Sequence, residues 1–380
     1  MKYYLIAGEA SGDLHGSNLM KGILESDPEA SFRFWGGDLM QAVGGFMVRH
    51  YKETAVMGLW DVVTHLGKIR NNFATCRRDI LEHRPDLLIL IDYPGFNLSM
   101  AEFAHSHGIK VYYYIAPKTW ASKEYRVKTI RRVVDRLYTI FPFETAYFKR
   151  FGIDVHFFGN PTMDSIESRI FKGESREEFC QRNGLDVTKP VVALLAGSRT
   201  GELKYNLPVM LREVALHPEC QFVIAGAPSF GQGDYEKYLT GYPQVKVVFG
   251  ETYQLLAQAR CAIVTSGTAT LETALMNCPQ VVLYLMWGGG FSDFIAKRLI
   301  IKVPYISLVN LNLNRRAVEE LFQKSYNPEK MHKLVDDMLA DTPYRAKMLS
   351  DYAELQRVIG DAGCSYRAAY DMVNNLKEGK

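Results

Sequence analysis

The chain has 380 residues, of which 47% are hydrophobic and 23% charged, a globular composition that excludes a mainly disordered or fibrous protein. This length predicts two domains, because single cores stop growing at roughly 250–300 residues. With 45 basic and 42 acidic residues the net charge is only +3, which argues against a protein held mainly by nucleic acid.

Cysteine usage and hydropathy point to a reducing compartment without a membrane span. The six cysteines are scattered and form no CxxC pair, which disfavours a disulfide framework and a zinc ribbon. The start, MKYYLIAGEASGD, lacks the longer apolar stretch of a secretory signal. No run approaches the roughly 18 apolar residues that span a bilayer. We therefore expect a cytoplasmic protein that at most binds a membrane surface.

Short apolar strands alternate with helical patterns in two series. The strands are continuous apolar runs, as expected where helices cover both faces of a parallel sheet. The first series comprises Tyr3–Ala7, Leu87–Ile91, Val111–Ile115 and Leu137–Ile140, and the second comprises Val191–Leu195, Phe222–Ala225, Val245–Phe249, Ala262–Thr265 and Val281–Leu285. Beyond about residue 312 the pattern is helical.

This alternation predicts two doubly wound, Rossmann-like α/β domains that face a cleft. We place the first in residues 1–165 and the second in residues 166–350. Residues 351–380 form a helical tail, for which packing back on the first domain is one arrangement. Ligands of such sheets bind in the loops beyond the carboxyl ends of the strands.

The usual motifs are missing from those loops. GxGxxG is absent after the first strand, and GxxxxGK[ST], HExxH and GxSxG are absent throughout. These absences disfavour a dehydrogenase, a P-loop kinase, a zincin and an α/β-hydrolase.

Two loops of the first half carry acids. In GEASGD the residues Glu9, Ser11, Gly12 and Asp13 follow the first strand. Small residues and the free N–H groups of the following helix leave room for a ligand there. The acids favour a ligand hydroxyl over a phosphate. A plain helix N-cap explains that spacing equally well. Asp92 closes the strand LLILI, and a carboxylate beside apolar bulk can act as a general base. An ordinary turn acid is the alternative for Asp92.

A basic and aromatic segment follows the third strand of the first series. Lys118–Arg136 holds seven basic residues against two acids, and Trp120, Arg126, Arg131 and Arg132 belong to it. Leu66–Arg78 is a second basic stretch. Such segments suit an anionic membrane surface or a phosphorylated amphiphile. A solvated helix face is the alternative.

Two loops of the second half suit a diphosphate. LLAGSRT places Gly197, Ser198 and Arg199 at a strand-to-helix turn, where arginine can bind a diphosphate bidentately and the helix dipole assists. SGTATLE repeats this arrangement after another strand, with Ser266, Gly267, Thr268, Thr270 and Glu272. Helix caps alone would explain the hydroxyl residues but not their coincidence with an arginine. The pair predicts a nucleotide-diphosphate site.

Ten strings in chain order resemble those of the lipid-A-disaccharide synthase family of Gram-negative bacteria. They are GEASGD, WGGDLM, VMGLWDVV, IDYPGFN, APKTWA, FPFE, FGNP, LLAGSRTGE, TSGTATLE and NLNLNRRAVEELFQ. The resemblance implies a GT-B glycosyltransferase that joins UDP-2,3-diacylglucosamine to 2,3-diacylglucosamine 1-phosphate. It also implies inversion at the sugar, release of UDP, no cofactor and no metal in the chemistry.

The resemblance also assigns roles to residues. It implies Arg199, Ser266, Thr268 and Glu272 on the UDP side, Asn310, Arg315, Glu320 and Gln323 near the donor, and Glu9, Ser11, Asp13, Asp92 and Asn97 in the acceptor domain. The family commonly carries a second aspartate where this chain has Gly95. We therefore expect Asp92 to be the general base, with Asp13 as the alternative.

Because both implied substrates carry acyl chains, such an enzyme would act peripherally on the cytoplasmic face of the inner membrane. The sequence leaves the choice between monomer and homodimer open. Alternatives are another GT-B enzyme, such as a UDP-GlcNAc 2-epimerase, and a non-catalytic nucleotide-sugar-binding or membrane-scaffold protein.

Overall fold

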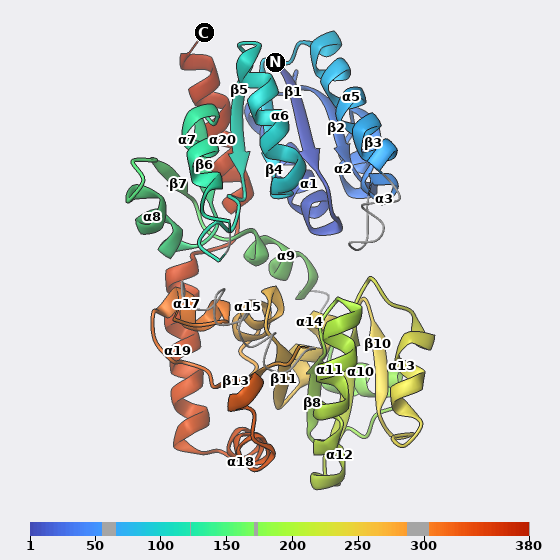
Figure 1. Ribbon diagram of the computed structural model, residues 1–380. Helices are drawn as coiled ribbons and strands as arrows, with labels where there is room; N and C mark the ends of the chain where they lie inside the picture. Colours follow the sequence, from blue (N-terminus) through green and yellow to red (C-terminus); the bar gives the residue numbers. More distant parts are fainter. Residues whose placement is uncertain (55–65, 122, 171–173, 287–303, 380) are drawn as a thin grey trace. The chain divides into compact units, whose positions relative to one another are not determined.

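The computed structural model describes residues 1–54, 66–121, 123–170, 174–286 and 304–379 (Figure 1). The chain divides into two compact units: unit 1 is Met1–Asp164 with Asp361–Lys380, and unit 2 is Ser165–Gly360. The VMGLWDVV string lies outside the described residues. A boundary after residue 350 would fall inside helix α19 (Pro343–Ile359), which lies wholly in unit 2.

The described residues of unit 1 form a seven-stranded parallel sheet in the order β3-β2-β1-β4-β5-β6-β7. The strands are β1 (Lys2–Ala7), β2 (Ser31–Gly36), β3 (Phe46–His50), β4 (Leu87–Ile91), β5 (Lys110–Tyr114), β6 (Arg136–Thr139) and β7 (Val155–Phe157). Every residue of β4 is buried, as its continuous apolar sequence predicts.

Helices cover both faces of this sheet. They are α1 (Ala10–Ser26), α2 (Asp38–Val43), α3 (Tyr51–Thr54), α5 (Leu66–His83), α6 (Pro94–Ser106), α7 (Arg126–Val133), α8 (Pro142–Lys149) and α20 (Cys364–Glu378). Helix α6 packs against both α5 and α7, whereas α1 packs against α2 and α20 (Figure 1). The last helix of the chain therefore completes the layer that begins with the first.

Close packing of α1 and α20 depends on a small residue. A Cβ atom at Gly22 would lie 2.9 Å from the Cβ of Ala369 and 2.9 Å from the Cα of Tyr366. Apolar residues of α20, including Met372 and Leu376, are buried in the same core cluster as β1 and β4. The final segment is thus part of the core of unit 1.

The described residues of unit 2 form a six-stranded parallel sheet in the order β10-β9-β8-β11-β12-β13. The strands are β8 (Val191–Leu195), β9 (Gln221–Gly226), β10 (Lys246–Phe249), β11 (Cys261–Thr265), β12 (Gln280–Tyr284) and β13 (Glu320–Phe322). The helices are α9 (Pro161–Ile170), which crosses from unit 1, α10 (Arg176–Asn183), α11 (Thr200–Met210), α12 (Arg212–Leu216), α13 (Gln232–Leu239), α14 (Thr252–Gln258), α15 (Thr268–Leu275), α17 (Leu308–Leu313), α18 (Pro328–Leu339) and α19, with the 3-10 helix η1 (Gln323–Ser325).

All nine predicted strands are present, and the described residues hold four further strands that were not predicted. In β2 the apolar run is interrupted by Arg33, whose guanidinium hydrogen-bonds the Asp79 carboxylate at 2.8–2.9 Å through Nε. The prediction of helix alone beyond residue 312 was wrong, because Glu320–Phe322 pairs with β12. Among the described residues, no helix combines the length and apolar composition needed to cross a membrane.

Candidate active site

Two acidic residues of unit 1, Glu9 and Asp92, lie where the order of its strands reverses. Strands β1 and β4 are neighbours, and the chain winds in opposite directions from them, so their carboxyl ends form the usual ligand-binding edge of such a sheet. Glu9 follows β1 and is exposed, and Asp92 follows β4 and is partly buried. The structure thus places these two predicted residues at one edge.

The main chain at Asp92 is held in an uncommon conformation. Asp92 and Tyr93 have φ values of +43° and +47°, in the left-handed region that side chains disfavour. The Asn97 amide donates to the main-chain oxygen of Asp92 at 2.8 Å, and the Tyr113 hydroxyl donates to the same oxygen at 2.6 Å. Such strain persists where surrounding contacts enforce it, and it clusters at functional sites.

Electrostatics prepare the Asp92 side chain for proton transfer. Burial raises the pKa of Asp92, and the nearby Glu9 carboxylate raises it further, whereas Lys118 lowers it. A carboxylate with a raised pKa is a stronger base than an exposed one. A hydrogen bond from the main chain of Tyr93 also lowers the pKa of Asp92.

Asn97 has a different role from the one that the resemblance implied. It is fully buried, and its amide also reaches the main-chain oxygen of Ile91 at 3.2 Å. It therefore positions Asp92 and does not offer a surface to an acceptor.

Asp13 supports a neighbouring loop. Its buried carboxylate accepts hydrogen bonds from the main-chain N–H groups of Gly37 at 2.8 Å, Leu39 at 3.0 Å and Met40 at 3.0 Å. These are orphan donors at the start of α2, which a carboxylate can satisfy. Gly12 is buried against Ala7, whereas Ser11 is exposed.

Space remains at Gly95, in the first turn of α6 and three residues after Asp92. Apart from its chain neighbours and the backbone of its own helix, no atom lies within 4 Å of a Cβ built there, and Gly95 is exposed. The backbone would therefore accept the aspartate that the family commonly carries.

The sequence analysis missed His15, one turn beyond Ser11 on α1. Burial lowers the pKa of His15 to about 4, and Lys118 also lowers it, whereas Asp164 raises it. Its Nδ1 is buried and has no hydrogen-bond partner among the described residues. The i, i+4 spacing from Ser11 was the signal that could have identified it.

Trp120 does not present its ring to solvent. It is 8% exposed, its indole N–H donates to the Glu144 carboxylate at 2.9 Å, and its ring contacts Phe143 edge to face. Burial raises the pKa of Glu144 to about 7. The exposed aromatic ring of this segment is instead Tyr125, which is 68% exposed.

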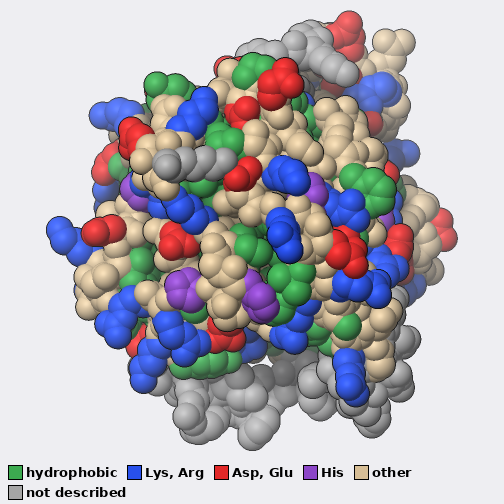
Figure 2. Space-filling view, turned by 90° about the horizontal axis from the view of Figure 1, so that it is seen from above, with side chains coloured by type: hydrophobic (Ala, Val, Ile, Leu, Met, Phe, Trp, Pro, Cys, Tyr) green, Lys and Arg blue, Asp and Glu red, His purple; other side chains and the backbone are tan. Residues whose placement is uncertain are grey.

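The basic helix α7 has one buried and one charged side. Val127, Ile130 and Val133 are buried, whereas Arg131 and Arg132 are exposed and Arg126 is partly exposed. Arg132 also forms an ion pair with Glu102 of α6. Figure 2 shows Lys and Arg side chains interspersed with acids on the face in view, with apolar groups in small areas. Charged side chains are therefore more prominent on that face than apolar ones, which form no continuous surface there.

In unit 2 the two predicted diphosphate loops follow adjacent strands. Strands β8 and β11 pair directly at the point where the strand order reverses. Gly197 has a φ of +98°, and a Cβ there would lie 2.5 Å from Oε2 of Glu202. Glu202 in turn accepts from the N–H of Ser198 at 3.0 Å. The side chain of Arg199 is 79% exposed, and its guanidinium forms an ion pair with Glu202 at 3.0 Å.

The second loop combines exposed and structural residues. Gly267 and Thr268 are exposed at the start of α15. Thr270 is fully buried and donates to the main-chain oxygen of Gly267 at 2.8 Å. The Ser266 hydroxyl donates to the oxygen of Ile306, and the Glu272 carboxylate accepts from the Tyr253 hydroxyl at 2.7 Å.

Asn310 and Glu320 organise the loop that precedes β13. The buried Asn310 amide donates to Glu320 at 2.8 Å, and its oxygen accepts from the N–H of Ala317 at 2.7 Å. Glu320 also accepts from the N–H groups of Ile306 and Ser307. In this structure both side chains shape the loop.

Arg315 and Gln323 differ in what they leave for a ligand. Arg315 donates to Asp351 at 2.9 Å and to Glu354 at 2.9 Å, and these partners raise its pKa. Its charge is therefore compensated within unit 2. Gln323 has a φ of +43°, and its buried Nε2 has no hydrogen-bond partner among the described residues.

Comparison with known proteins gives a match over almost the whole chain. The model of a family described as lipid-A-disaccharide synthetase matches residues 3–362. The lipid-A-disaccharide synthase of Geobacter sulfurreducens is 38% identical over 370 residues, which cover 96% of this chain and 94% of that protein. Other bacterial proteins of the same name are similar at 32–38% identity.

Solved structures share the fold at low identity. The MnaA–UDP structure from S. aureus has a TM-score of 0.68 and 11% identity, covering 99% of this chain and 97% of that one. The calicheamicin glycosyltransferase CalG4 has a TM-score of 0.57 and 13% identity, covering 99% and 98%. At these identities the likeness concerns the fold alone, two Rossmann-like α/β units of the GT-B type.

Proposed function

This chain belongs to the lipid-A-disaccharide synthase family, and from that premise we propose how its residues perform the family's reaction. The chain is a glycosyltransferase of lipid A biosynthesis. It joins UDP-2,3-diacylglucosamine to 2,3-diacylglucosamine 1-phosphate and releases UDP. The observation that carries this function is the family match over residues 3–362, which takes in both parallel sheets.

Asp92 is the proposed general base. As the acceptor hydroxyl oxygen attacks C1 of the donor sugar, its proton passes to the Asp92 carboxylate. The bond from C1 to the UDP oxygen breaks, and UDP leaves with the electron pair, so C1 is inverted. The raised pKa and enforced backbone of Asp92 support this role. The three N–H bonds that Asp13 accepts favour a structural role for Asp13.

The loops after β8 and β11 are the proposed site of the UDP diphosphate. Arg199 supplies a largely exposed guanidinium, and the N-terminus of α15 supplies N–H groups beside Gly267 and Thr268. These groups stabilise the negative charge that grows on UDP as the bond breaks. Arg315 contributes less charge because two carboxylates already compensate it.

An acceptor-dependence assay tests this function. The purified chain is supplied with the UDP-diacyl sugar alone, with the diacylated sugar phosphate added, and with a deacylated acceptor. We expect UDP release only when donor and diacylated acceptor are both present. Conversion of UDP-GlcNAc without any acceptor would favour an epimerase, and UDP binding without turnover would favour a nucleotide-sugar-binding protein.

Helices α5 and α7 are the proposed contact with an anionic membrane surface. Exposed arginines lie on both helices: Arg70, Arg77 and Arg78 on α5, and Arg131 and Arg132 on α7. Each basic residue near such a surface contributes about 1 kcal/mol of attraction. Acylated substrates would be met at that surface.

Charge reversal tests the membrane contact. We expect the double variant Arg131→Glu/Arg132→Glu to bind anionic phosphatidylglycerol vesicles at least tenfold more weakly, since two attractive contacts become repulsive. The matched control reverses two exposed lysines of unit 2, Lys237→Glu/Lys246→Glu, for the same change in net charge. Equal vesicle binding by the two double variants would contradict the proposed surface.

A further inference from the structure

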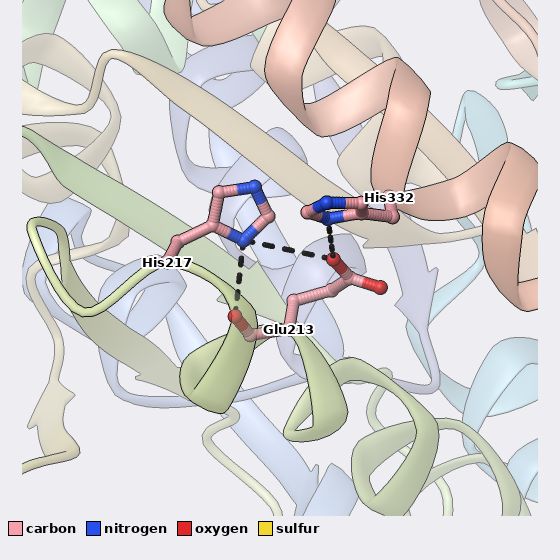
Figure 3. Close-up of side chains that lie close together, drawn as sticks. All are labelled: Glu213, His217 and His332. Atoms are coloured by element: carbon pink, nitrogen blue, oxygen red, sulfur yellow. Dashed lines mark hydrogen bonds and ion pairs between the residues drawn. The ribbon is translucent and has the colours of Figure 1, made fainter.

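A cluster of two histidines and two acids lies in unit 2, apart from the loops assigned above. Glu213 is on α12, His217 follows that helix directly, and His332 is on α18 (Figure 3). One ligand atom from each of these three residues lies within 4.8 Å of the others. Asp336, one turn beyond His332, adds a second carboxylate. None of these groups has a part in the proposed reaction.

The two imidazoles lie between the two carboxylates. Nδ1 of His332 is 3.4 Å from Oε2 of Glu213, and Nδ1 of His217 is 3.7 Å from the same oxygen. On the other side, Nε2 of His217 is 3.1 Å from Oδ1 of Asp336, and Nε2 of His332 is 3.6 Å from Oδ2 of Asp336. Every ring nitrogen of the pair therefore faces a carboxylate.

Proton counting makes this arrangement unfavourable for neutral histidines. A neutral imidazole carries one N–H, and if Nε2 of each ring donates it to Asp336, both Nδ1 atoms hold lone pairs. The lone pair of His217 then lies 3.0 Å from the main-chain oxygen of Glu213. Both Nδ1 lone pairs also face Oε2 of Glu213. Oε2 of Glu213 and Nδ1 of His332 are buried and have no hydrogen-bond partner among the described residues. A bound cation would resolve both defects.

We propose that Oε2 of Glu213 and the Nδ1 atoms of His217 and His332 bind one divalent transition-metal ion, with Zn²⁺ as the best match, while Asp336 accepts hydrogen bonds from the two Nε2–H groups. Two imidazoles with one carboxylate are a ligand set that Zn²⁺ accepts. Bonds of about 2.0–2.1 Å place the ligand atoms of a tetrahedral zinc site about 3.4 Å apart, close to the 3.4 Å and 3.7 Å that separate the two Nδ1 atoms from Oε2 of Glu213. Two acids with two neutral imidazoles carry the charge −2 that a divalent ion balances.

Burial provides both rigidity and access. The side chains of Glu213 and His217 are 3% and 2% exposed, whereas those of His332 and Asp336 are 37% and 56% exposed. Glu213 and His217, the inner pair, are fixed by packing. His332 and Asp336, the outer pair, leave an entry path from solvent. An ion there would join α12 to α18 and thus stabilise unit 2.

The position indicates a structural role for the ion. His217 lies four residues before β9 begins, at the amino ends of the parallel strands. The proposed UDP loops lie at the carboxyl ends of β8 and β11. We therefore expect the ion to change stability and to leave catalytic turnover unaffected, so this proposal stands or falls separately from the proposed function.

Zinc titration of the full-length protein tests the site. The protein is stripped with a chelator, dialysed, and titrated with ZnCl₂ by calorimetry, with thermal unfolding and the UDP-release rate measured in parallel. We expect one Zn²⁺ per chain, a higher unfolding temperature, an unchanged rate at the assay temperature, and visible absorption bands of tetrahedral Co²⁺ when CoCl₂ replaces zinc. Absence of binding by the folded wild type would overturn the proposal.

Variants of the outer residues locate the ion. We expect His332→Ala and Asp336→Asn each to weaken Zn²⁺ binding at least tenfold, and circular dichroism checks that both remain folded. His105→Ala, which removes an exposed histidine of unit 1, should bind as the wild type does. Cys220 follows His217 closely, so Cys220→Ser is also tested. Binding that is lost in Cys220→Ser and retained in His332→Ala would assign the ion to the thiol and overturn the proposal.

Discussion

Replacing Asp92 by asparagine should lower the activity of the enzyme without lowering its stability. The change keeps the size of the side chain, and the bonds from Asn97 and Tyr113 reach the main-chain oxygen, so the local fold should persist. A general base contributes about 10²–10⁴-fold to the rate. We therefore expect kcat to fall by that factor, equivalent to about 3–5 kcal/mol in the barrier, with little change in KM.

Stability should move the other way because burial raises the pKa of Asp92. An acid whose pKa is higher in the folded than in the unfolded state destabilises the fold once the pH exceeds its ordinary value, since ionisation then costs more in the folded state. A neutral asparagine removes that cost. The unfolding midpoint of the variant at neutral pH should therefore equal or exceed that of the wild type.

The assay follows UDP release across pH for the wild type, Asp92→Asn and the exposed control Asp154→Asn. The wild-type kcat/KM should fall as the pH drops through the raised pKa of Asp92, above the ordinary value of 3.8. The control should keep this acid limb, and Asp92→Asn should lose it together with the rate. A folded Asp92→Asn enzyme with wild-type turnover would refute the assignment of the base.

Three further changes test the neighbouring assignments. Arg199→Ala should lower the rate at least tenfold, about 1.4 kcal/mol in the barrier, and weaken UDP binding in calorimetry, whereas Lys204→Ala on the same helix should do neither; equal UDP binding by both variants would remove Arg199 from the site. Gly95→Asp should fold normally, because, apart from its chain neighbours and the backbone of its own helix, its Cβ meets no atom within 4 Å, and a second carboxylate beside Asp92 should raise the pKa of the acid limb further; an unshifted limb would place the new carboxylate too far away. Asp13→Asn should lower the free energy of unfolding by about 1–3 kcal/mol in urea titrations, because an amide replaces a carboxylate that accepts three N–H bonds; an unchanged midpoint with lost activity would return Asp13 to the chemistry.

The sequence predicted the strands that form the centre of each sheet. Strands β4, β8 and β11 are buried along their whole length, so their apolar runs are unmistakable. The strands that it missed are shorter or interrupted. Arg33 interrupts β2 and is compensated by Asp79, which lies 46 residues away, and β13 has three residues. Such compensation depends on tertiary contacts that a local pattern does not contain.

The candidate site was predictable at the level of loops but less so at the level of side-chain roles. Loops after adjacent parallel strands meet at one edge, so the positions of Asp92 and Arg199 followed from strand order once the strands were known. The inward orientation of Asn97 and the cap formed by Asp13 depend on which partners the fold brings to them. The histidine pair could not be predicted from the sequence, because His217 and His332 are 115 positions apart and only the fold brings them together.

The return of α20 to unit 1 has a consequence for how the protein is made. During synthesis from the amino terminus, every residue of unit 2 leaves the ribosome before the helix that covers α1 exists. The apolar surface around Gly22 and Met20 therefore stays exposed to solvent while unit 2 is synthesised and forms its sheet. A nascent chain stalled short of Cys364 should be a target for chaperones, and maturation of the first half should depend on the last helix to emerge.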